Sequence, residues 1–327
     1  MVARRWSAST DLSAVAGPLC IGVDVSKDWL DIADTAGRAV RIANTVAAIT
    51  EALAGPWSQG CRAMVCEATG GYERPLRLVA AQLGLPLRRV HPNRARAFAQ
   101  AAARLAKTDA IDARMLARFA AFIADEPARP SPAPQTQTLA ALVSRLDQLS
   151  DLRQSESCRA HQAHEASVKA SIGAGIEVLD SQIDAIQHAI DALIASDPIL
   201  TEKASLLRSC KGVGPKNAQM ILARLPEIGA LDRRKIAALV GVAPITCKSG
   251  SSINRASIAG GRKPLRDTLF MAALCASSHN PTFIAFRDRL KANGKPHKLI
   301  IVAVIRKLIV TLNAMIKAKT PFKPALT

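Results

Sequence analysis

Four acidic residues stand where carboxylates could do chemistry at a phosphodiester. Asp24 interrupts an apolar run, Glu67 ends another, and Asp109 and Asp112 stand three residues apart in a helical pattern. A charge inside a buried strand is costly unless it is paired or binds a metal. Carboxylate oxygens suit Mg²⁺ or Mn²⁺, and two such ions about 3.5–4 Å apart can activate a nucleophile and stabilise a leaving oxygen. We therefore predict that these four residues are catalytic and hold Mg²⁺, with Mn²⁺ as the alternative.

Three of these acids also have a structural interpretation. Asp109 could cap a helix after Thr108, Asp112 could be a solvated acid in the first helical turn, and Asp24 could cap a turn. Joint placement at two strand ends and on one helix face favours the metal site.

A serine-rich basic loop is a second candidate for chemistry. Ser249 stands beside a glycine, with Ser251 and Ser252 as neighbours, in a segment rich in lysine and arginine. Such a serine could attack phosphorus if its proton were removed and the developing charge were stabilised. The alternative is a loop that only binds phosphate. The cations assigned to nucleic-acid binding here are Lys248, Arg255, Arg262, Lys263 and Arg266.

A glycine-containing turn precedes this loop. Lys211, Gly212, Gly214 and Lys216 lie between two expected helices, 200–209 and 217–225. Glycines let backbone N–H groups approach a ligand closely, and a helix N-terminus attracts phosphate. The pattern is similar to a helix-hairpin-helix that binds a nucleic-acid backbone, and an ordinary helix–helix turn is the alternative.

Net charge points to a polyanionic partner. The chain of 327 residues has a formal net charge of +18, and residues 201–327 alone hold 23 Lys and Arg against 5 Asp and Glu. A charge of this size attracts nucleic acid or an anionic membrane. Aromatic residues are only 3%, so contacts to backbone phosphates are favoured over stacking of unpaired bases.

Other bulk features limit the class of protein. We find no signal peptide and no apolar run long enough to span a membrane, since the longest, 299–315, is interrupted by polar residues. The seven cysteines form no CxxC pair, which favours a reducing cytoplasm and excludes a disulfide framework or a zinc site of that kind.

The elements that must position the acids follow an α/β order. We expect strands at 19–25, 29–33, 39–42, 62–66 and 87–90, with helices at 46–54, 71–83, 92–103 and 109–122. Three meander strands followed by parallel additions are the order of a ribonuclease-H-like domain, which we place at residues 18–126.

Long helices follow a proline-rich linker at 127–134. Apolar residues step by alternating fours and threes from Ile172 to Leu193, which is a heptad seam, and a similar seam begins at Leu139. An antiparallel helical hairpin broken near Gly173 and Gly175, or a coiled coil that dimerises, fits residues 135–198, with packing inside one subunit as the alternative. A mainly helical domain is expected at 200–320.

With these residues in view, the chain resembles the DEDD-type transposases of the insertion-sequence-110 family. The matching stretches are 21–27, 66–73, 107–113, 212–214, 239–244, 248–250 and 260–266. The likeness covers residues 18–320, and the three acidic motifs together with the Ser-Gly step are specific as a set. Residues 1–17 match nothing in the family, and Ile111 replaces a residue that is often polar.

The resemblance implies a RuvC-like N-terminal domain, a coiled-coil spacer and a C-terminal transposase domain. It implies that Asp24, Glu67, Asp109 and Asp112 hold Mg²⁺ while Ser249 attacks DNA to give a covalent intermediate. The implied partners are donor and target double-stranded DNA, a noncoding bridge RNA that guides the reaction, and further copies of the chain in a dimer or tetramer. No membrane partner is implied.

Two other functions remain open from the residues. One is a Holliday-junction-resolving endonuclease, in which the acids activate water and the serine only binds phosphate. The other is a DNA-binding protein without enzymatic activity, which the four filled acidic positions disfavour.

Overall fold

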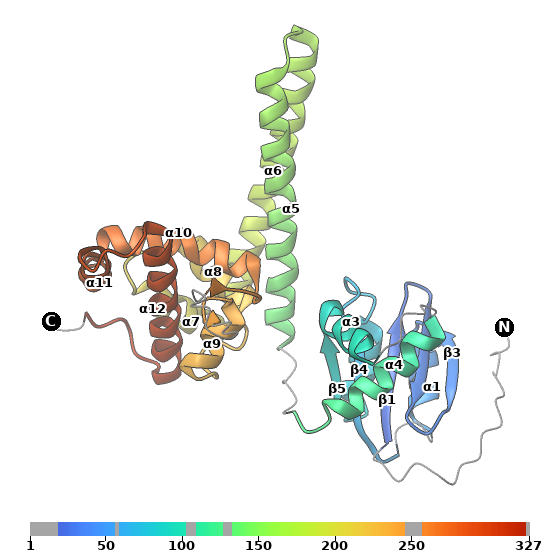
Figure 1. Cartoon of the computed structure of the whole chain (residues 1–327). Helices are drawn as coiled ribbons and strands as arrows, with labels where there is room; N and C mark the ends of the chain where they lie inside the picture. Colours follow the sequence, from blue (N-terminus) through green and yellow to red (C-terminus); the bar gives the residue numbers. More distant parts are fainter. Residues whose placement is uncertain (1–18, 56–58, 103–108, 127–132, 246–256, 325–327) are drawn as a thin grey trace. The chain divides into compact units, whose positions relative to one another are not determined.

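The computed structural model describes residues 19–55, 59–102, 109–126, 133–245 and 257–324, with the side chains of 109–111 excepted. The chain divides between residues 131 and 132 into two compact units, here called unit 1 and unit 2. Unit 1 contains a sheet with helices, and unit 2 is helical and begins with two long helices (Figure 1).

Unit 1 contains a five-stranded sheet. Its strands are β1 (Leu19–Val25), β2 (Trp29–Asp34), β3 (Ala39–Ala43), β4 (Cys61–Glu67) and β5 (Leu87–Val90). The order across the sheet is β3-β2-β1-β4-β5. β2 is antiparallel to β1 and β3, while β1, β4 and β5 are mutually parallel. The predicted order of three meander strands and parallel additions is confirmed, and the domain is ribonuclease-H-like.

Helices cover both faces of this sheet. One face packs α1 (Val46–Leu53) and α2 (Arg74–Gln82) through a core that includes Ile21, Val23 and Cys66. The other face packs α3 (Pro92–Ala101) and α4 (Asp109–Phe122) through a core that includes Cys20 and Val65. Because side chains alternate along a strand, even-numbered residues of β1 and odd-numbered residues of β4 face α4.

Helix α4 runs against the direction of the parallel strands. Just beyond its C-terminal end, the carbonyls of Ile123 and Ala124 accept hydrogen bonds from Arg88, at the start of β5. Asp125 pairs with Arg62, at the start of β4. The N-terminal end of α4 therefore lies at the edge where β1 and β4 end.

Gly22 allows α4 to lie this close to β1. A Cβ atom at Gly22 would be 2.1 Å from the backbone nitrogen of Ala117 and 2.2 Å from the carbonyl oxygen of Ala113. Glycine is therefore required where the helix crosses the strand.

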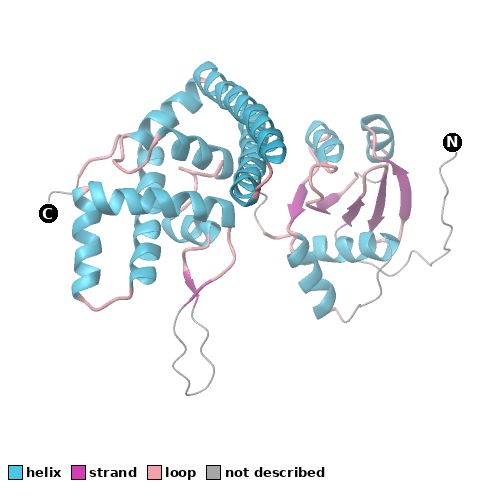
Figure 2. Ribbon diagram, turned by 90° about the horizontal axis from the view of Figure 1, so that it is seen from above, coloured by secondary structure: helices cyan, strands magenta, loops and turns pink. Residues whose placement is uncertain are grey.

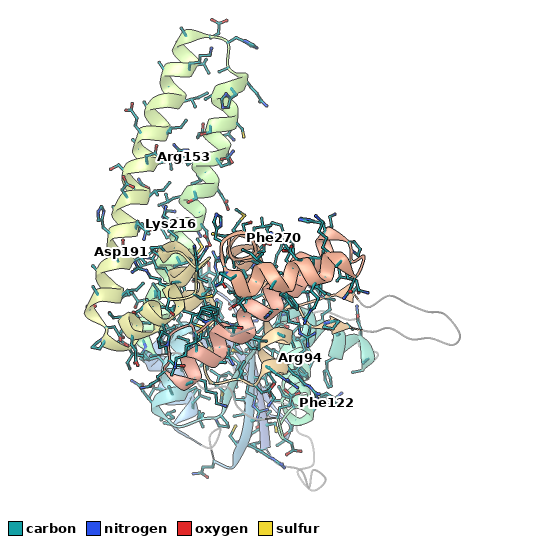
Figure 3. All side chains as sticks on the ribbon, turned by 90° about the vertical axis from the view of Figure 1, so that its left-hand side faces the viewer. Arg94, Phe122, Arg153, Asp191, Lys216 and Phe270 are labelled. Atoms are coloured by element: carbon teal, nitrogen blue, oxygen red, sulfur yellow. The ribbon has the colours of Figure 1, made fainter. Side chains whose placement is uncertain are left out.

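Unit 2 begins with a hairpin of two long helices, α5 (Pro134–Gln162) and α6 (Ala166–Ser196). The helices pack on each other, and Arg153 on α5 forms an ion pair with Asp180 on α6 (Figure 3). The chain reverses at residues 163–165, and α6 continues through Gly173 and Gly175. The expected break at these glycines was wrong, because a helix tolerates glycine at a cost of about 1 kcal/mol each.

Shorter helices pack around the base of this hairpin. They are α7 (Pro198–Arg208), α8 (Pro215–Arg224), α9 (Arg233–Val240), α10 (Lys263–His279), α11 (Pro281–Ala292) and α12 (His297–Ala318). Leu139 and Ile190 of the hairpin belong to the same buried core as these helices. Two short strands, β6 (Pro244–Ile245) and β7 (Ser257–Ile258), pair antiparallel between α9 and α10 (Figure 2).

Helix α12 is long and strongly apolar. By length and composition it could cross a membrane, contrary to the expectation from sequence, but more than half of its most apolar stretch is buried in the unit. Val304, Leu308 and Leu312 are fully buried in the shared core. This packing is that of a core helix.

Candidate active site

Asp24 and Glu67 lie side by side at the edge of the sheet. β1 and β4 are parallel, and Val23 pairs with Cys66 in their register. The next residue along each strand is an acid, so both carboxylates lie at the C-terminal ends of neighbouring strands. Both belong to the face that packs α4, and both are half-buried.

Helix α4 brings Asp112 to the same edge. Asp112 is half-buried and directly precedes Ala113, the residue that contacts Gly22 two positions before Asp24. Asp109 is the first residue of α4, and its side chain lies outside the described part of the structure. The strand register and the direction of α4 thus place Asp24, Glu67 and the first residues of α4 at the same edge of the sheet.

The donors fit a hard divalent cation in kind, since carboxylate oxygens are the ligands that Mg²⁺ and Mn²⁺ prefer. Among the side chains that the structure describes, no three His, Cys, Asp or Glu residues are placed to hold a metal ion. Asp109, the fourth acid, is not among those side chains.

Glu73, which the sequence analysis did not single out, organises the loop after Glu67. Its carboxylate is buried and accepts hydrogen bonds from the Gly71 amide at 2.9 Å and from Arg89 at 2.9 Å. Burial acts to raise the pKa of Glu73, but the hydrogen bonds from Arg89 and the backbone outweigh it and lower that pKa.

Asn44 joins the loops that follow the two strand-end acids. Its Nδ2 donates to the carbonyl oxygen of Ser26 at 2.9 Å and to that of Tyr72 at 2.9 Å. Ser26 lies in the loop after Asp24, and Tyr72 lies in the loop after Glu67. Asn44 holds these loops together from a position that no sequence motif marks.

The ionised state of Glu73 should stabilise unit 1 above its unfolded pKa. Because the folded pKa is lowered from 4.5, this stabilisation is present above about pH 4.5 and is lost as the pH falls through the folded pKa. We expect Glu73→Gln to cost on the order of 1.5–3 kcal/mol at pH 7, which is typical for hydrogen bonds to a charged group. Urea unfolding at several pH values should show the wild type and the variant converging below pH 4.5.

The control for this experiment is Glu51→Gln, since Glu51 is exposed on α1. It should change the unfolding free energy by no more than about 0.5 kcal/mol at every pH tested. A cost of Glu73→Gln that does not change with pH would show that the ionised carboxylate contributes nothing.

The segment with the second candidate site is described only at its ends. Ser249, Ser251, Ser252, Lys248 and Arg255 lie outside the described residues. Pro244 pairs with Ile258 and Ile245 pairs with Ser257, which brings the two ends of the segment together. Beside this pairing, Gly241 and Gly261 both have positive φ, and a Cβ on Gly261 would be 2.3 Å from the nitrogen of Gly241. The two glycines permit this close approach.

The described arginines near this loop have internal partners. Arg262 makes two hydrogen bonds to Glu227, at 2.8 and 2.6 Å, and a third to the carbonyl oxygen of Arg224 at 2.6 Å. Arg266 donates to the carbonyl oxygen of Gly260 at 2.8 Å. These guanidinium groups thus support the base of the loop. Lys263 is exposed and pairs with Asp267 one helical turn away.

The glycine-containing turn lies between α7 and α8. Gly212 has a φ of 112°, and a Cβ there would be 2.6 Å from the Cα of Ala276 on α10. Asn280 is buried and donates to the carbonyl oxygen of Lys211 at 3.2 Å. Lys216 (Figure 3) and Lys211 are exposed. Gly214 is the N-cap of α8. The turn is held from inside the unit, and its lysine side chains face solvent.

Comparisons with known proteins identify the family of the chain. A profile of the transposase IS116/IS110/IS902 family matches residues 204–288, and a DEDD transposase profile of the same group matches residues 21–165. The chain is 30% identical to a pilin gene-inverting protein of Moraxella bovis over 92% of this chain and 97% of the relative. It is 31% identical to a pilin gene-inverting protein of Moraxella lacunata over 79% and 81% of the two chains. A putative transposase of Sinorhizobium fredii matches at 30% over 44% and 41%.

The ribonuclease-H-like domain with its acidic edge, joined to a basic helical unit, defines a DNA-processing enzyme. The chain belongs to the IS110 family of transposases, as the full-length relative and the two profiles show. Membership in this family implies a DNA substrate and dependence on a divalent metal.

Proposed function

We propose that this transposase is a site-specific DNA recombinase that is guided by a noncoding bridge RNA and works through a serine-linked intermediate. The convergence of Asp24, Glu67 and the start of α4 at one edge of the sheet carries the catalytic part of this proposal. The relatives from Moraxella are named as gene-inverting proteins, which supports recombination between defined sites and makes inversion one product to look for.

In the proposed reaction, the Ser249 hydroxyl loses its proton and its oxygen forms a new bond to phosphorus. The bond from phosphorus to one deoxyribose oxygen breaks, and that oxygen leaves as a hydroxyl. A hydroxyl from another strand end then attacks the phosphoserine, which rejoins DNA and releases the serine. Mg²⁺, when bound, would stabilise charge at phosphorus and at the leaving oxygen.

Asp24, Glu67, Asp109 and Asp112 would hold that ion. Their position at the open ends of β1 and β4, beside loops fixed by Asn44 and Glu73, would keep the carboxylates oriented before substrate binds. Arginines fixed at the base of the serine loop would limit the movement of that loop.

We assign three functional parts: the catalytic domain at 18–126, a coiled-coil spacer at 135–198 and a transposase domain at 200–320. The α5–α6 hairpin would join subunits in a dimer or tetramer. The turn at Lys211–Lys216 would act as a helix-hairpin-helix on the DNA backbone, because exposed lysines flank backbone amides at the start of α8. The acids of one subunit would then serve the serine of another.

The test compares wild-type protein with Ser249→Ala in the presence of DNA, Mg²⁺ and RNA transcribed from the flanks of the gene. Wild type should form a protein–DNA adduct that survives denaturing electrophoresis, and Ser249→Ala should form none. Ser251→Ala and Ser252→Ala are the matched controls and should retain the adduct. Cleavage by Ser249→Ala without any adduct in wild type would favour a junction-resolving endonuclease that uses water.

A further inference from the structure

The junction of α11 and α12 carries positive charge that nothing described so far uses. Residues 287–307 contain seven Lys and Arg and one acid, Asp288. Asp288 pairs with Arg287 at 2.8 Å, and Arg287 also donates to the carbonyl oxygen of Ser277 at 2.7 Å. The remaining six cations of this stretch therefore receive little compensation from their own segment.

Two of these cations meet on one aromatic ring. The Lys307 ammonium on α12 lies 4.5 Å from the ring centroid of Phe286 on α11, and the Arg289 guanidinium lies 5.4 Å from the same centroid. Lys307 also lies 5.7 Å from the ring of Phe283. We call Phe286, Arg289 and Lys307 the Phe286 cluster. Attraction to the ring positions the two cations.

The two like charges in this cluster destabilise each other. Burial lowers the pKa of Lys307, and the positive charge of Arg289 lowers it further. A bound anion would reverse the second effect, because it would attract both cations. The cluster is therefore arranged to gain from an anionic ligand.

The carboxylates of residues 201–327 do not fill this role. All five acids in residues 201–327 pair with cations elsewhere: Glu202 with Lys319, Glu227 with Arg262, Asp232 with Lys235, Asp267 with Lys263, and Asp288 with Arg287. Within the described residues, neither Arg289 nor Lys307 has a carboxylate within 4.0 Å.

The ligand that fits is the phosphate backbone of duplex DNA. The protein acts on DNA, and adjacent phosphates of a duplex present negative charge at regular spacing. The ring of Phe286 is already engaged by cations, which disfavours stacking of unpaired bases on it. We propose that the Phe286 cluster is a contact site for duplex DNA, distinct from the acidic edge, the Lys211–Lys216 turn and the serine loop. This proposal rests on DNA binding by the family and not on the serine mechanism.

The test is binding of a fixed duplex to full-length protein over a range of salt concentrations. Each phosphate contact contributes about 0.9 to the slope of log affinity against log salt. We expect Arg289→Gln with Lys307→Gln to weaken binding and to reduce the slope by about 2, and Arg289→Gln alone by about 1. Arg289→Lys with Lys307→Arg keeps both charges and should retain the slope.

The matched control is Lys317→Gln with Lys323→Gln, which removes two charges from exposed positions near the C-terminus. If both double variants lose the same affinity and the same salt slope, only net charge matters and the proposed contact site is wrong. If Arg289→Gln with Lys307→Gln weakens binding to an RNA duplex of the same sequence but not to the DNA duplex, DNA is not the occupant of the site. Because duplex binding is measured without recombination, failure here is distinguishable from failure of the proposed serine reaction.

Discussion

Asp24→Asn should reduce strand cleavage at least about 100-fold while leaving duplex binding intact. Even the residues that orient metal ligands typically account for 10–100-fold in activity or metal affinity, so loss of a ligand charge should exceed this. Asn keeps the size of the side chain and removes the negative charge that Mg²⁺ requires. Glu67→Gln, the neighbouring substitution across the β1–β4 ladder, should have the same effect.

The measurements are cleavage of labelled duplex, affinity for the same duplex, and thermal unfolding. Glu51→Gln is the control, because it removes a carboxylate charge from an exposed position on α1, which packs on the sheet face opposite α4. It should leave cleavage unchanged. If Asp24→Asn loses stability or DNA binding in proportion to cleavage, Asp24 has a structural role and its assignment as a metal ligand is wrong.

Gly22→Ala should be the most damaging small substitution in unit 1. Its methyl group would lie 2.1–2.2 Å from backbone atoms of α4, and a backbone cannot rotate away as a side chain can. Overpacking a core typically costs about 1–3 kcal/mol and occasionally more, and we expect the upper end of that range. Since α4 also positions Asp112, cleavage should fall together with stability.

Hydrogen exchange measures this effect locally, because the two units need not unfold together. Amides of α4 should exchange faster in Gly22→Ala, while those of α12 should not change. Gly173→Ala should have the opposite effect on stability. A Cβ at Gly173 meets open space, so the variant should stabilise α6 by about 0.5–1 kcal/mol. Unchanged exchange in α4 would mean that the helix does not press on β1.

The sequence predicted the elements of unit 1 because each has a local cause. Apolar alternation marks the strands, and a charge at the end of β1 or β4 stands out against it. The direction of α4 has no local cause, since it depends on Arg62 and Arg88 meeting carbonyl and carboxylate groups beyond the helix. The requirement for glycine at position 22 also has no local cause, because it depends on the helix α4 that crosses β1 there.

Long-range pairing also explains what sequence reasoning missed in unit 2. Arg262 and Arg266 stand out in the sequence only as cations near a serine loop, and their binding to nucleic acid stays a prediction. The partner of Arg262, Glu227, is 35 positions away in sequence, and Arg266 binds a backbone carbonyl that no motif marks. The prediction of a break at Gly173 was wrong because a helix tolerates glycine, and α6 runs from Ala166 to Ser196.

Arg224 connects parts of unit 2 that are far apart in the chain. Its guanidinium binds Asp147 on α5 and donates to Thr268 on α10 at 2.7 Å, and its carbonyl accepts from Arg262 beside the serine loop. Arg224 contacts α5 near its middle, and the α5–α6 hairpin extends roughly 20 Å beyond Asp147, at 1.5 Å per residue. If the hairpin joins subunits as we propose, a force on its far end would reach the ends of the serine loop through Arg224 and Arg262. Subunit assembly would then change the position of the proposed nucleophile.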